Sequence, residues 1–407
     1  MKKYKAGWLI DGSGRPAEKN MVLSVAGSEI CGIERAAAST PGDDTVLDFS
    51  GCTLLPGLID AHVHLFMSGT YDSAIRGSQL QEAGFDAVRG DILRRLKASL
   101  DSGIVAIRDG GDRYAHAMVY KNNHLDRRTT PIAVLAAGKA WRRAGRYGKL
   151  IGRDPGKGNT LAAAIKGSRE KTDHVKIVNS GLNSLTQFGR QTLPQFSQEE
   201  LDAAVTSAKE IGLKTMVHAN GVAPVETAVK AGCDSIEHGF FMGRDNLARM
   251  ADHETVWVPT AVTMQAYIEY MQSEVGRQSR LQNGKGALSP VEGAQRNLEH
   301  QLEQMAMARQ LGVRVAVGTD AGSPGVDHGK SLRGEIGLLI RAGYSIPEAM
   351  KSATCINAQL LGLKGIGCLA VGAAASFVAV AGPPEDIPQS LASIQALFIG
   401  GKKWFGK

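Results

Sequence analysis

Cysteine is scarce in this sequence, and the few cysteines that occur form no motif. Five are spread over 407 residues, with no Cys-x-x-Cys pair among them. This spacing excludes a zinc knuckle and a Cys-x-x-Cys redox centre, so reduced and mostly buried thiols are expected. The five are Cys31, Cys52, Cys233, Cys355 and Cys368.

Long apolar runs are absent as well. No apolar stretch reaches the roughly 18 residues that a membrane-spanning helix needs. The first 14 residues contain lysines but reach Trp8, Asp11 and Gly12 before the apolar core of an export signal could form. We therefore expect a cytoplasmic protein that does not bind membranes.

A strong excess of one charge is also missing. The 47 lysines and arginines exceed the 40 acidic residues by seven, and they are scattered apart from one basic stretch at 142–146. Nucleic acid is therefore not an expected partner. The hydrophobic content of 43% and charged content of 21% are ordinary for a soluble globular protein.

The most informative stretch is 55–65, which reads Leu-Pro-Gly-Leu-Ile-Asp-Ala-His-Val-His-Leu. Successive side chains on a strand point to opposite faces, so His62 and His64 share one face. At a rise of roughly 3.3 Å per residue their imidazoles lie about 7 Å apart along the backbone. Two imidazoles on one face can converge on a metal ion.

The strand pattern predicts an α/β protein with a (β/α)8 barrel and a small β-sandwich domain formed by both chain ends. Residues 1–52 and 365–407 contain short β-like pieces, whereas 53–364 alternate apolar runs with longer helical patterns. Eight strands are expected at 53–65, 105–108, 132–137, 174–178, 214–218, 235–238, 257–259 and 313–319. Helices are expected at 85–102, 159–171, 197–211, 224–231, 290–311 and 346–362. Ser197 followed by Glu200 has the form of a capping box.

Polar side chains stand where these strands end, which is where a barrel of this kind places its chemistry. A single buried histidine is usually a packed core residue. Four histidines and an aspartate at strand ends are hard to explain by packing, because each buried polar group needs a partner. The collected residues are His62, His64, Lys176, His218, His238 and Asp320.

Together these segments resemble the amidohydrolase superfamily of metal-dependent hydrolases, in the branch of imidazolonepropionase-like enzymes and metal-dependent prolidases or dipeptidases. The matching motifs are the 55–64 segment, Arg-Asp-Gly-Gly at 108–111, the Lys176, His218 and His238 segments, and Gly-Thr-Asp-Ala-Gly at 318–322. Short pieces at 353–354, 357–358 and 360–362 also fit.

The resemblance implies a site for two divalent metal ions, usually zinc. His62, His64 and Asp320 would hold one ion, and His218 and His238 the other. Lys176 would bridge them as a carbamate formed with carbon dioxide. An ammonium beside two dications would be repelled, whereas a carbamate offers two anionic oxygens.

The implied activity is hydrolysis of a C–N amide bond in a small molecule, by a hydroxide that bridges the metals. Asp320 would accept the proton of the water and deliver it to the leaving nitrogen. The amide could belong to a dipeptide, to an N-acyl amino acid or to a cyclic compound. A homo-oligomer is compatible with the resemblance, because many barrels of this type pair.

The loop at 138–148 departs from this branch, whose members often carry a histidine there. It holds a cluster of arginines instead, and guanidinium is a natural partner for carboxylate or phosphate. An ordinary solvated loop explains the cluster equally well. The candidates for substrate contact are Arg142, Arg143, Arg146, Tyr147 and, from the loop after Asp320, His328.

Two other classes of function remain open. The first is a hydrolytic deaminase of a ring amino group on the same barrel, although such enzymes generally use one metal and lack the bridging lysine. The second is a non-catalytic scaffold, as in relatives that keep the barrel and lose the ligands, although all six ligand positions are occupied in this sequence. About two metal ions per chain would favour the amide hydrolase, one the deaminase and none the scaffold.

Overall fold

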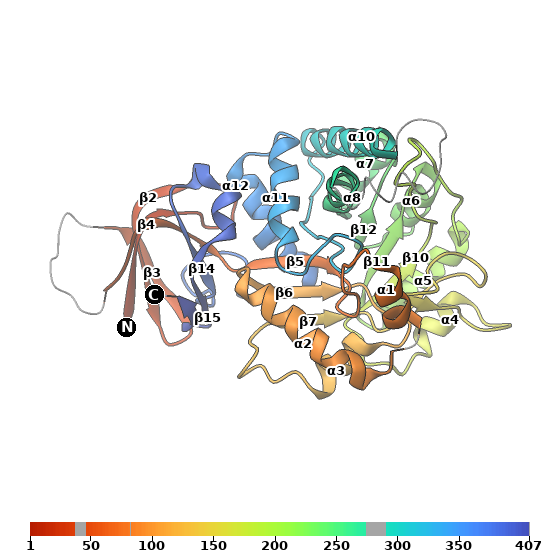
Figure 1. The fold of residues 1–407 in the computed structure, drawn as a ribbon, viewed down its shortest axis with the longest axis horizontal. Helices are drawn as coiled ribbons and strands as arrows, with labels where there is room; N and C mark the ends of the chain where they lie inside the picture. The colour runs from red at the N-terminus through yellow and green to blue at the C-terminus, as the bar shows by residue number, and fades with distance from the viewer. Residues whose placement is uncertain (37–45, 82, 274–289, 407) are drawn as a thin grey trace.

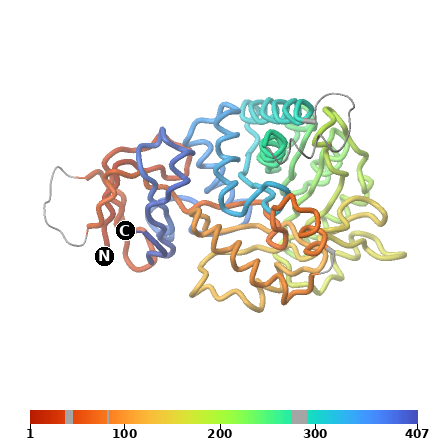
Figure 2. The backbone as a smooth tube through the Cα atoms, in the orientation of Figure 1, coloured from red at the N-terminus to blue at the C-terminus, as the bar shows by residue number. Residues whose placement is uncertain are grey.

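The computed structural model describes residues 1–36, 46–81, 83–273 and 290–406. A small sheet domain lies at one end and a larger α/β domain at the other (Figure 1). Both chain termini lie in the small domain, beside each other in the view of Figure 2. Strands from the two ends of the chain therefore lie in one sheet.

The small domain is one seven-stranded sheet in the order β16-β15-β14-β4-β1-β2-β3. The strands form one continuous sheet and not the two sheets of the expected sandwich, because β4 pairs with β1 on one side and with β14 on the other. Strands from the two chain ends thus meet edge to edge. The strands are β1 (Lys2–Leu9), β2 (Glu18–Ala26), β3 (Glu29–Arg35), β4 (Val46–Pro56), β14 (Phe377–Ala381), β15 (Ile394–Ile399) and β16 (Lys402–Gly406).

Aromatic rings fill the core of this sheet domain. The ring of Tyr4 contacts Phe377 and Phe398 edge-on, with centroids 5.0 and 4.8 Å apart. Phe377 and Phe398 stack on each other at 4.6 Å. Such pairs add to the stabilisation that comes from burial alone. This core joins β1 to β14 and β15, and so holds the two chain ends together.

The larger domain contains two parallel sheets, with the orders β5-β6-β7 and β13-β12-β11-β10-β8-β9. The first contains β5 (Leu58–Val63), β6 (Ile104–Asp109) and β7 (Ala133–Ala136). The second contains β8 (Ala140–Trp141), β9 (Gly152–Arg153), β10 (His174–Val178), β11 (Lys214–Ala219), β12 (Ser235–His238) and β13 (Val256–Val258). Seven of the eight expected strands are thus present, and β8 and β9 are additional.

The eighth expected strand, at 313–319, forms only isolated bridges. It connects β13 to β5 through the hydrogen bonds Ala316 N–Trp257 O (2.8 Å) and Ala61 N–Val317 O (3.0 Å). The side chain of Asn357 accepts from the amide of Val317 at 3.1 Å and donates to its carbonyl at 2.8 Å, so Val317 is bonded to Asn357 as well as to β5. In the described residues the two sheets therefore do not form one closed hydrogen-bonded barrel.

Helices surround these strands, with α2 and α3 on one side and α8, α10 and α11 on the other (Figure 1). The capping box at Ser197 and Glu200 is confirmed at the start of α5. The expected helix at 346–362 is interrupted by a π-helical turn, and five helices (α1, α3, α7, α8, α11) were not predicted. The helices are α1 (Ser73–Gln81), α2 (Phe85–Asp101), α3 (His116–Asn123), α4 (Leu161–Lys166), α5 (Gln198–Glu210), α6 (Val222–Lys230), α7 (Arg244–Asp252), α8 (Val262–Gln272), α10 (Pro290–Gln310), α11 (Ser331–Arg341), α12 (Ile346–Lys351), η1 (Ser352–Ile356) and α13 (Asn357–Leu361), with 3-10 turns η2 (Pro384–Asp386) and η3 (Gln389–Ala392).

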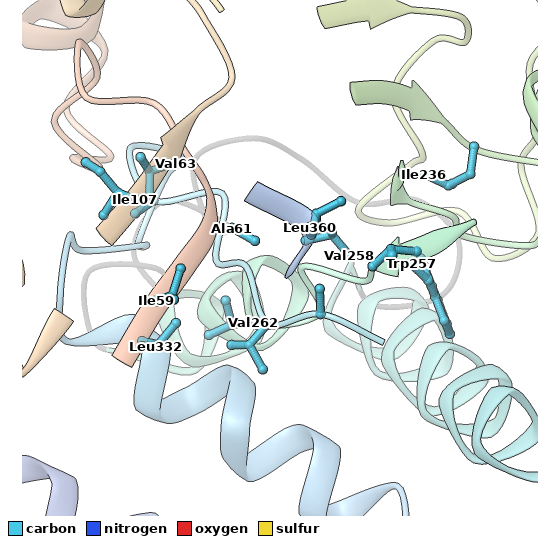
Figure 3. Close-up of a cluster of buried hydrophobic side chains, with 14 of the residues drawn as sticks. Ile59, Ala61, Val63, Ile107, Ile236, Trp257, Val258, Val262, Leu332 and Leu360 are labelled. Atoms are coloured by element: carbon cyan, nitrogen blue, oxygen red, sulfur yellow. The ribbon is translucent and has the colours of Figure 1, made fainter. Parts of the chain in front are cut away.

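The core of the larger domain lies among the strands and the helices that cover them. Figure 3 shows Ile59, Ala61 and Val63 of β5 in one cluster of buried side chains that also contains Ile236 of β12 and Trp257 of β13. All six residues of β5 are buried, because both faces of the strand are covered. Among the described helices, none combines the length and apolar character needed to cross a membrane.

Candidate metal centre

Two histidines stand at the end of β5. His62 and His64 are buried, with ring centroids 5.5 Å apart. The ring Nδ1 of His64 lies 2.8 Å from the carbonyl oxygen of Gly111, which leaves Nε2 for another partner. Gly110 lies so close that a Cβ there would be 2.8 Å from the His64 ring and 3.2 Å from the His62 ring. A glycine at this position therefore makes room for both imidazoles.

Asp320 faces this histidine pair from the segment after residue 319. Its Oδ1 lies 3.3 Å from Nε2 of His64 and 3.5 Å from Nε2 of His62. Its Oδ2 accepts a hydrogen bond of 2.8 Å from the Ser323 hydroxyl. Burial alone would raise the pKa of Asp320, but the neighbouring histidines hold it well below its usual range. One ligand atom from each of His62, His64 and Asp320 lies within 4.8 Å of the other two.

A second histidine pair lies beside this cluster. The rings of His218 and His238, at the ends of β11 and β12, have centroids 4.6 Å apart, and His238 lies 5.1 Å from His62. Nε2 of His218 contacts the carbonyl oxygen of Gly181 at 3.0 Å, and Nδ1 of His238 contacts the Thr260 hydroxyl at 2.7 Å. Each ring thus has one nitrogen engaged with the protein and one left for a ligand.

Lys176 is buried in the middle of β10. Lys176 is only 1% exposed, and its Nζ has no hydrogen-bond partner among the described residues. Burial, together with the positive charge of Arg108, lowers the pKa of this amine to about 8, although Glu237 and Asp320 oppose the shift. A buried amine without a partner is costly, so it indicates a site that is completed by another group.

The donor set fits a divalent cation. Nε2 of His62 and Nζ of Lys176 are buried without a hydrogen-bond partner among the described residues, and Nδ1 of His62 faces a carboxylate oxygen of Glu237 at 2.8 Å. Imidazole nitrogens and a carboxylate oxygen are ligands that zinc accepts. The four histidines and Asp320 therefore cluster near the ends of β5, β11 and β12, and Lys176 lies within β10, the neighbour of β11.

The predicted arginine cluster contacts other protein groups. Arg142 lies 3.8 Å from a carboxylate oxygen of Asp154, and Arg143 forms an ion pair with Glu200. Arg146 is exposed and donates a hydrogen bond of 3.3 Å to a backbone carbonyl. Among the described residues, Arg146 is the one arginine of the three without a carboxylate partner.

Tyr147 and His328 take different positions. The Tyr147 ring lies 5.3 Å from the His218 ring, and 38% of the residue is exposed, so it stands at the edge of the histidine cluster. Burial of its hydroxyl and the charge of Asp320 raise its pKa. His328 is buried, and its Nε2 lies 3.2 Å from the backbone carbonyl of His64. His328 therefore contacts the backbone behind the candidate ligands.

Sequence reasoning missed three charged residues near the centre. Arg108 and Glu237 are buried, and each is a charged residue inside an expected strand, which is the signal that could have identified them. Arg76 of α1 donates a hydrogen bond of 3.0 Å to the carbonyl of Gly322, two positions after Asp320. Among the described residues, no carboxylate lies within ion-pair distance of Arg76.

Known proteins resemble this chain over most of its length. It is 26% identical over 359 residues to an uncharacterized protein of Mycobacterium tuberculosis, covering 88% of this chain and 85% of that protein. It is 24% identical over 437 residues to ochratoxinase of Aspergillus niger, covering 98% of this chain and 86% of that protein. The solved structure of a Xaa-Pro dipeptidase with bound methionine covers all of both chains, with a TM-score of 0.80 and 24% identity.

The family assignment rests on a match over most of the chain. The family model of the amidohydrolase family matches residues 53–403, which include every candidate ligand and four strands of the small domain in whole or part. The chain therefore belongs to the amidohydrolase family and is a hydrolase that acts on carbon–nitrogen bonds.

Proposed function

We propose that this protein hydrolyses a C–N amide bond of a small molecule at a centre for two divalent cations, with zinc as the usual ion. The carrying observation is the cluster of four histidines and Asp320 together with the nearby amine of Lys176, which is buried without a partner among the described residues. Among the described residues the protein offers no partner for Nζ of Lys176 or Nε2 of His62, whereas cations with a bridging anion would satisfy both.

The proposed ligands divide into two sets. His62, His64 and Asp320 would hold one ion, and His218 and His238 the other. Lys176 would lie between them as a carbamate, formed when its neutral amine adds to carbon dioxide and loses a proton. When bound, the ions would acidify water and polarise the substrate carbonyl.

Asp320 is proposed as the general base and acid. The Ser323 hydroxyl occupies Oδ2 of this carboxylate at 2.8 Å, so Oδ1 is the oxygen that faces the histidines. Asp320 would accept a proton from the attacking water as the bond to the carbonyl carbon forms. It would return that proton to the leaving nitrogen as the C–N bond breaks, which leaves a carboxylic acid and an amine.

The arrangement of the strands is proposed to be that of a (β/α)8 barrel. The bonds that connect residues 314–317 to β13 and β5 support it, because they link the open edges of the two parallel sheets. Likeness to solved structures such as the Xaa-Pro dipeptidase supports the same fold. The domains would be 53–364 for the barrel and 1–52 with 365–407 for the small domain.

The substrate is proposed to carry an anionic group, as in a dipeptide or an N-acyl amino acid. Four arginines are candidates to bind it: the predicted Arg142, Arg143 and Arg146, and Arg76, which the structure adds. Arg76 and Arg146 are the stronger candidates, because the other two already face carboxylates. Tyr147, beside His218, is proposed to contact the substrate near the reacting amide.

A metal analysis combined with a substrate screen tests this function. Dipeptides, N-acyl amino acids and cyclic amides would be offered to the zinc-loaded protein and to the double variant His62→Ala/His64→Ala. We expect about two ions per wild-type chain, amide hydrolysis by the wild type and none by the variant. If the protein instead bound one ion per chain and released ammonia from ring amines, the proposed function would be wrong and the protein would be a deaminase. A folded chain without bound metal would refute it.

A further inference from the structure

A buried glutamate lies behind the first candidate ligand. Glu237 of β12 is fully buried, and its Oε2 lies 2.8 Å from Nδ1 of His62. This nitrogen points away from Asp320, whose Oδ1 lies near Nε2 of the same ring. The carboxylate therefore contacts the side of the imidazole opposite the candidate metal.

The other oxygen of Glu237 is held in place by two donors. Its Oε1 accepts hydrogen bonds from Arg108 at 2.9 Å and from the Ser235 hydroxyl at 2.5 Å. Arg108 also donates to the backbone carbonyl of Ala61, next to His62, at 2.7 Å, and to Ser235 at 3.0 Å. The guanidinium thus connects the strand of the histidine to the strand of the glutamate, and Glu237 cannot turn away without breaking its ion pair with Arg108.

We propose that Glu237 is a positioning residue that sets the tautomer of His62: it accepts the Nδ1 proton, so that the Nε2 lone pair faces Asp320 and the metal. A neutral imidazole carries one N–H and one lone pair, and only the lone pair can bind a cation. A partner that accepts at Nδ1 therefore decides which nitrogen is available. This inference rests on the proposed metal centre for its consequence, but the tautomer itself exists without metal.

The variant Glu237→Gln tests the proposal because it keeps the shape and reverses the hydrogen bond. Arg108 and Ser235 will donate their hydrogen bonds to the amide oxygen of the replacement side chain, so its NH2 group will face Nδ1 of His62. The ring must then accept at Nδ1 and carry its proton at Nε2, which blocks the lone pair on the metal side. The matched control is Asp234→Asn, which alters a carboxylate three positions earlier that binds the amide and hydroxyl of Thr215.

Two measurements separate positioning from a structural role. The first is the ¹⁵N NMR spectrum of histidine-labelled, metal-free protein, with the His62 signals assigned by the variant His62→Gln. We expect an Nδ1 proton in the wild type and in Asp234→Asn, and an Nε2 proton in Glu237→Gln. The second is zinc affinity by competition with a chelator, which should fall ~10- to 100-fold in Glu237→Gln and stay within about twofold in Asp234→Asn.

An Nε2 proton on His62 in the metal-free wild type overturns the proposal, whether or not the variant folds. Folded Glu237→Gln with unchanged zinc affinity also overturns it. A wild type that shows the Nδ1 proton but binds no zinc would refute the proposed function and leave the tautomer assignment intact. The two hypotheses therefore fail by different observations.

Discussion

The Thr319 hydroxyl donates a hydrogen bond of 2.7 Å to a carboxylate oxygen of Asp60, although the two residues are 259 positions apart. The other oxygen of Asp60 accepts from the amide of Thr319 at 3.0 Å and from the amide of His62 at 3.2 Å. One buried carboxylate thus connects β5 to the segment that carries Asp320. Together with the backbone hydrogen bond of 2.7 Å from the amide of Asp320 to the carbonyl of His62, this connection holds Asp320 beside the two histidines.

The variant Asp320→Asn should keep this framework and lose turnover. The amide retains the shape of the carboxylate but cannot accept a proton from water, so we expect kcat to fall ~10²- to 10⁴-fold with an unchanged circular dichroism spectrum. The control Ser323→Ala removes the hydrogen bond to Oδ2 and leaves the carboxylate, so its kcat should fall far less than that of Asp320→Asn. Turnover of Asp320→Asn within tenfold of the wild type would exclude a general-base role.

The variant Lys176→Met should stabilise the metal-free protein. Methionine has a similar length and needs no hydrogen bond, so removing the buried amine should raise the free energy of unfolding by ~1–3 kcal/mol in the presence of a chelator. The variant should also bind fewer metal ions and gain less stability from zinc than the wild type does.

Lys214→Met is the matched control for this experiment. Lys214 donates hydrogen bonds of 2.9 and 2.7 Å to the carbonyls of Gln359 and Leu360. Its replacement should lower stability without altering metal content. A Lys176→Met protein that binds the wild-type amount of zinc would show that the lysine is not a bridging ligand.

Single substitutions of the four arginines should identify the residue that binds the anionic group. We expect Arg76→Leu to raise KM ~10-fold or more for an N-acyl amino acid, because a charge-assisted hydrogen bond is lost. The same substrate with its carboxylate converted to an amide should show no such increase. Arg142→Leu and Arg143→Leu should act less strongly, since these residues face Asp154 and Glu200. If no variant changes KM for the acid relative to the amide, the substrate has no arginine-bound anion.

Stability should fall as pH rises because of Glu335. This carboxyl is fully buried, and burial raises its pKa to about 8, although the amides of Val262 and Ala261 donate to it. Between its ordinary pKa near 4.5 and 8, the folded protein holds a proton that the unfolded chain has released. The folded state then binds more protons than the unfolded state. The part of the free energy of unfolding that protonated Glu335 contributes is therefore present at low pH and is lost as pH rises.

The variant Glu335→Gln removes this titration. The amide cannot accept both backbone hydrogen bonds, so the variant should be less stable at pH 5, and the difference should narrow by roughly 1.4 kcal/mol per pH unit up to pH 8. Urea unfolding at a series of pH values, with matched metal content, measures it. Parallel pH profiles of wild type and variant would contradict the assignment.

Several features of the protein could be read from short stretches of its sequence. The alternation of side chains on a strand placed His62 and His64 on one face, and the rule that barrel chemistry lies at strand ends selected Lys176, His218 and Asp320. The capping box at Ser197 predicted the start of α5. Such inferences are possible because periodicity, capping and strand ends depend on residues that are neighbours along the chain, and the capping box is confirmed.

Tertiary structure alone decided which distant groups meet. The pairing of Arg108 with Glu237 spans 129 positions, and nothing local to either strand specifies it. The Glu200 contact of Arg143 and the single sheet of the small domain likewise depend on segments far apart in sequence. Short-range rules identify which residues are chemically capable. Which of them share a partner is decided by how the strands and helices pack, because only the fold brings their side chains within bonding distance.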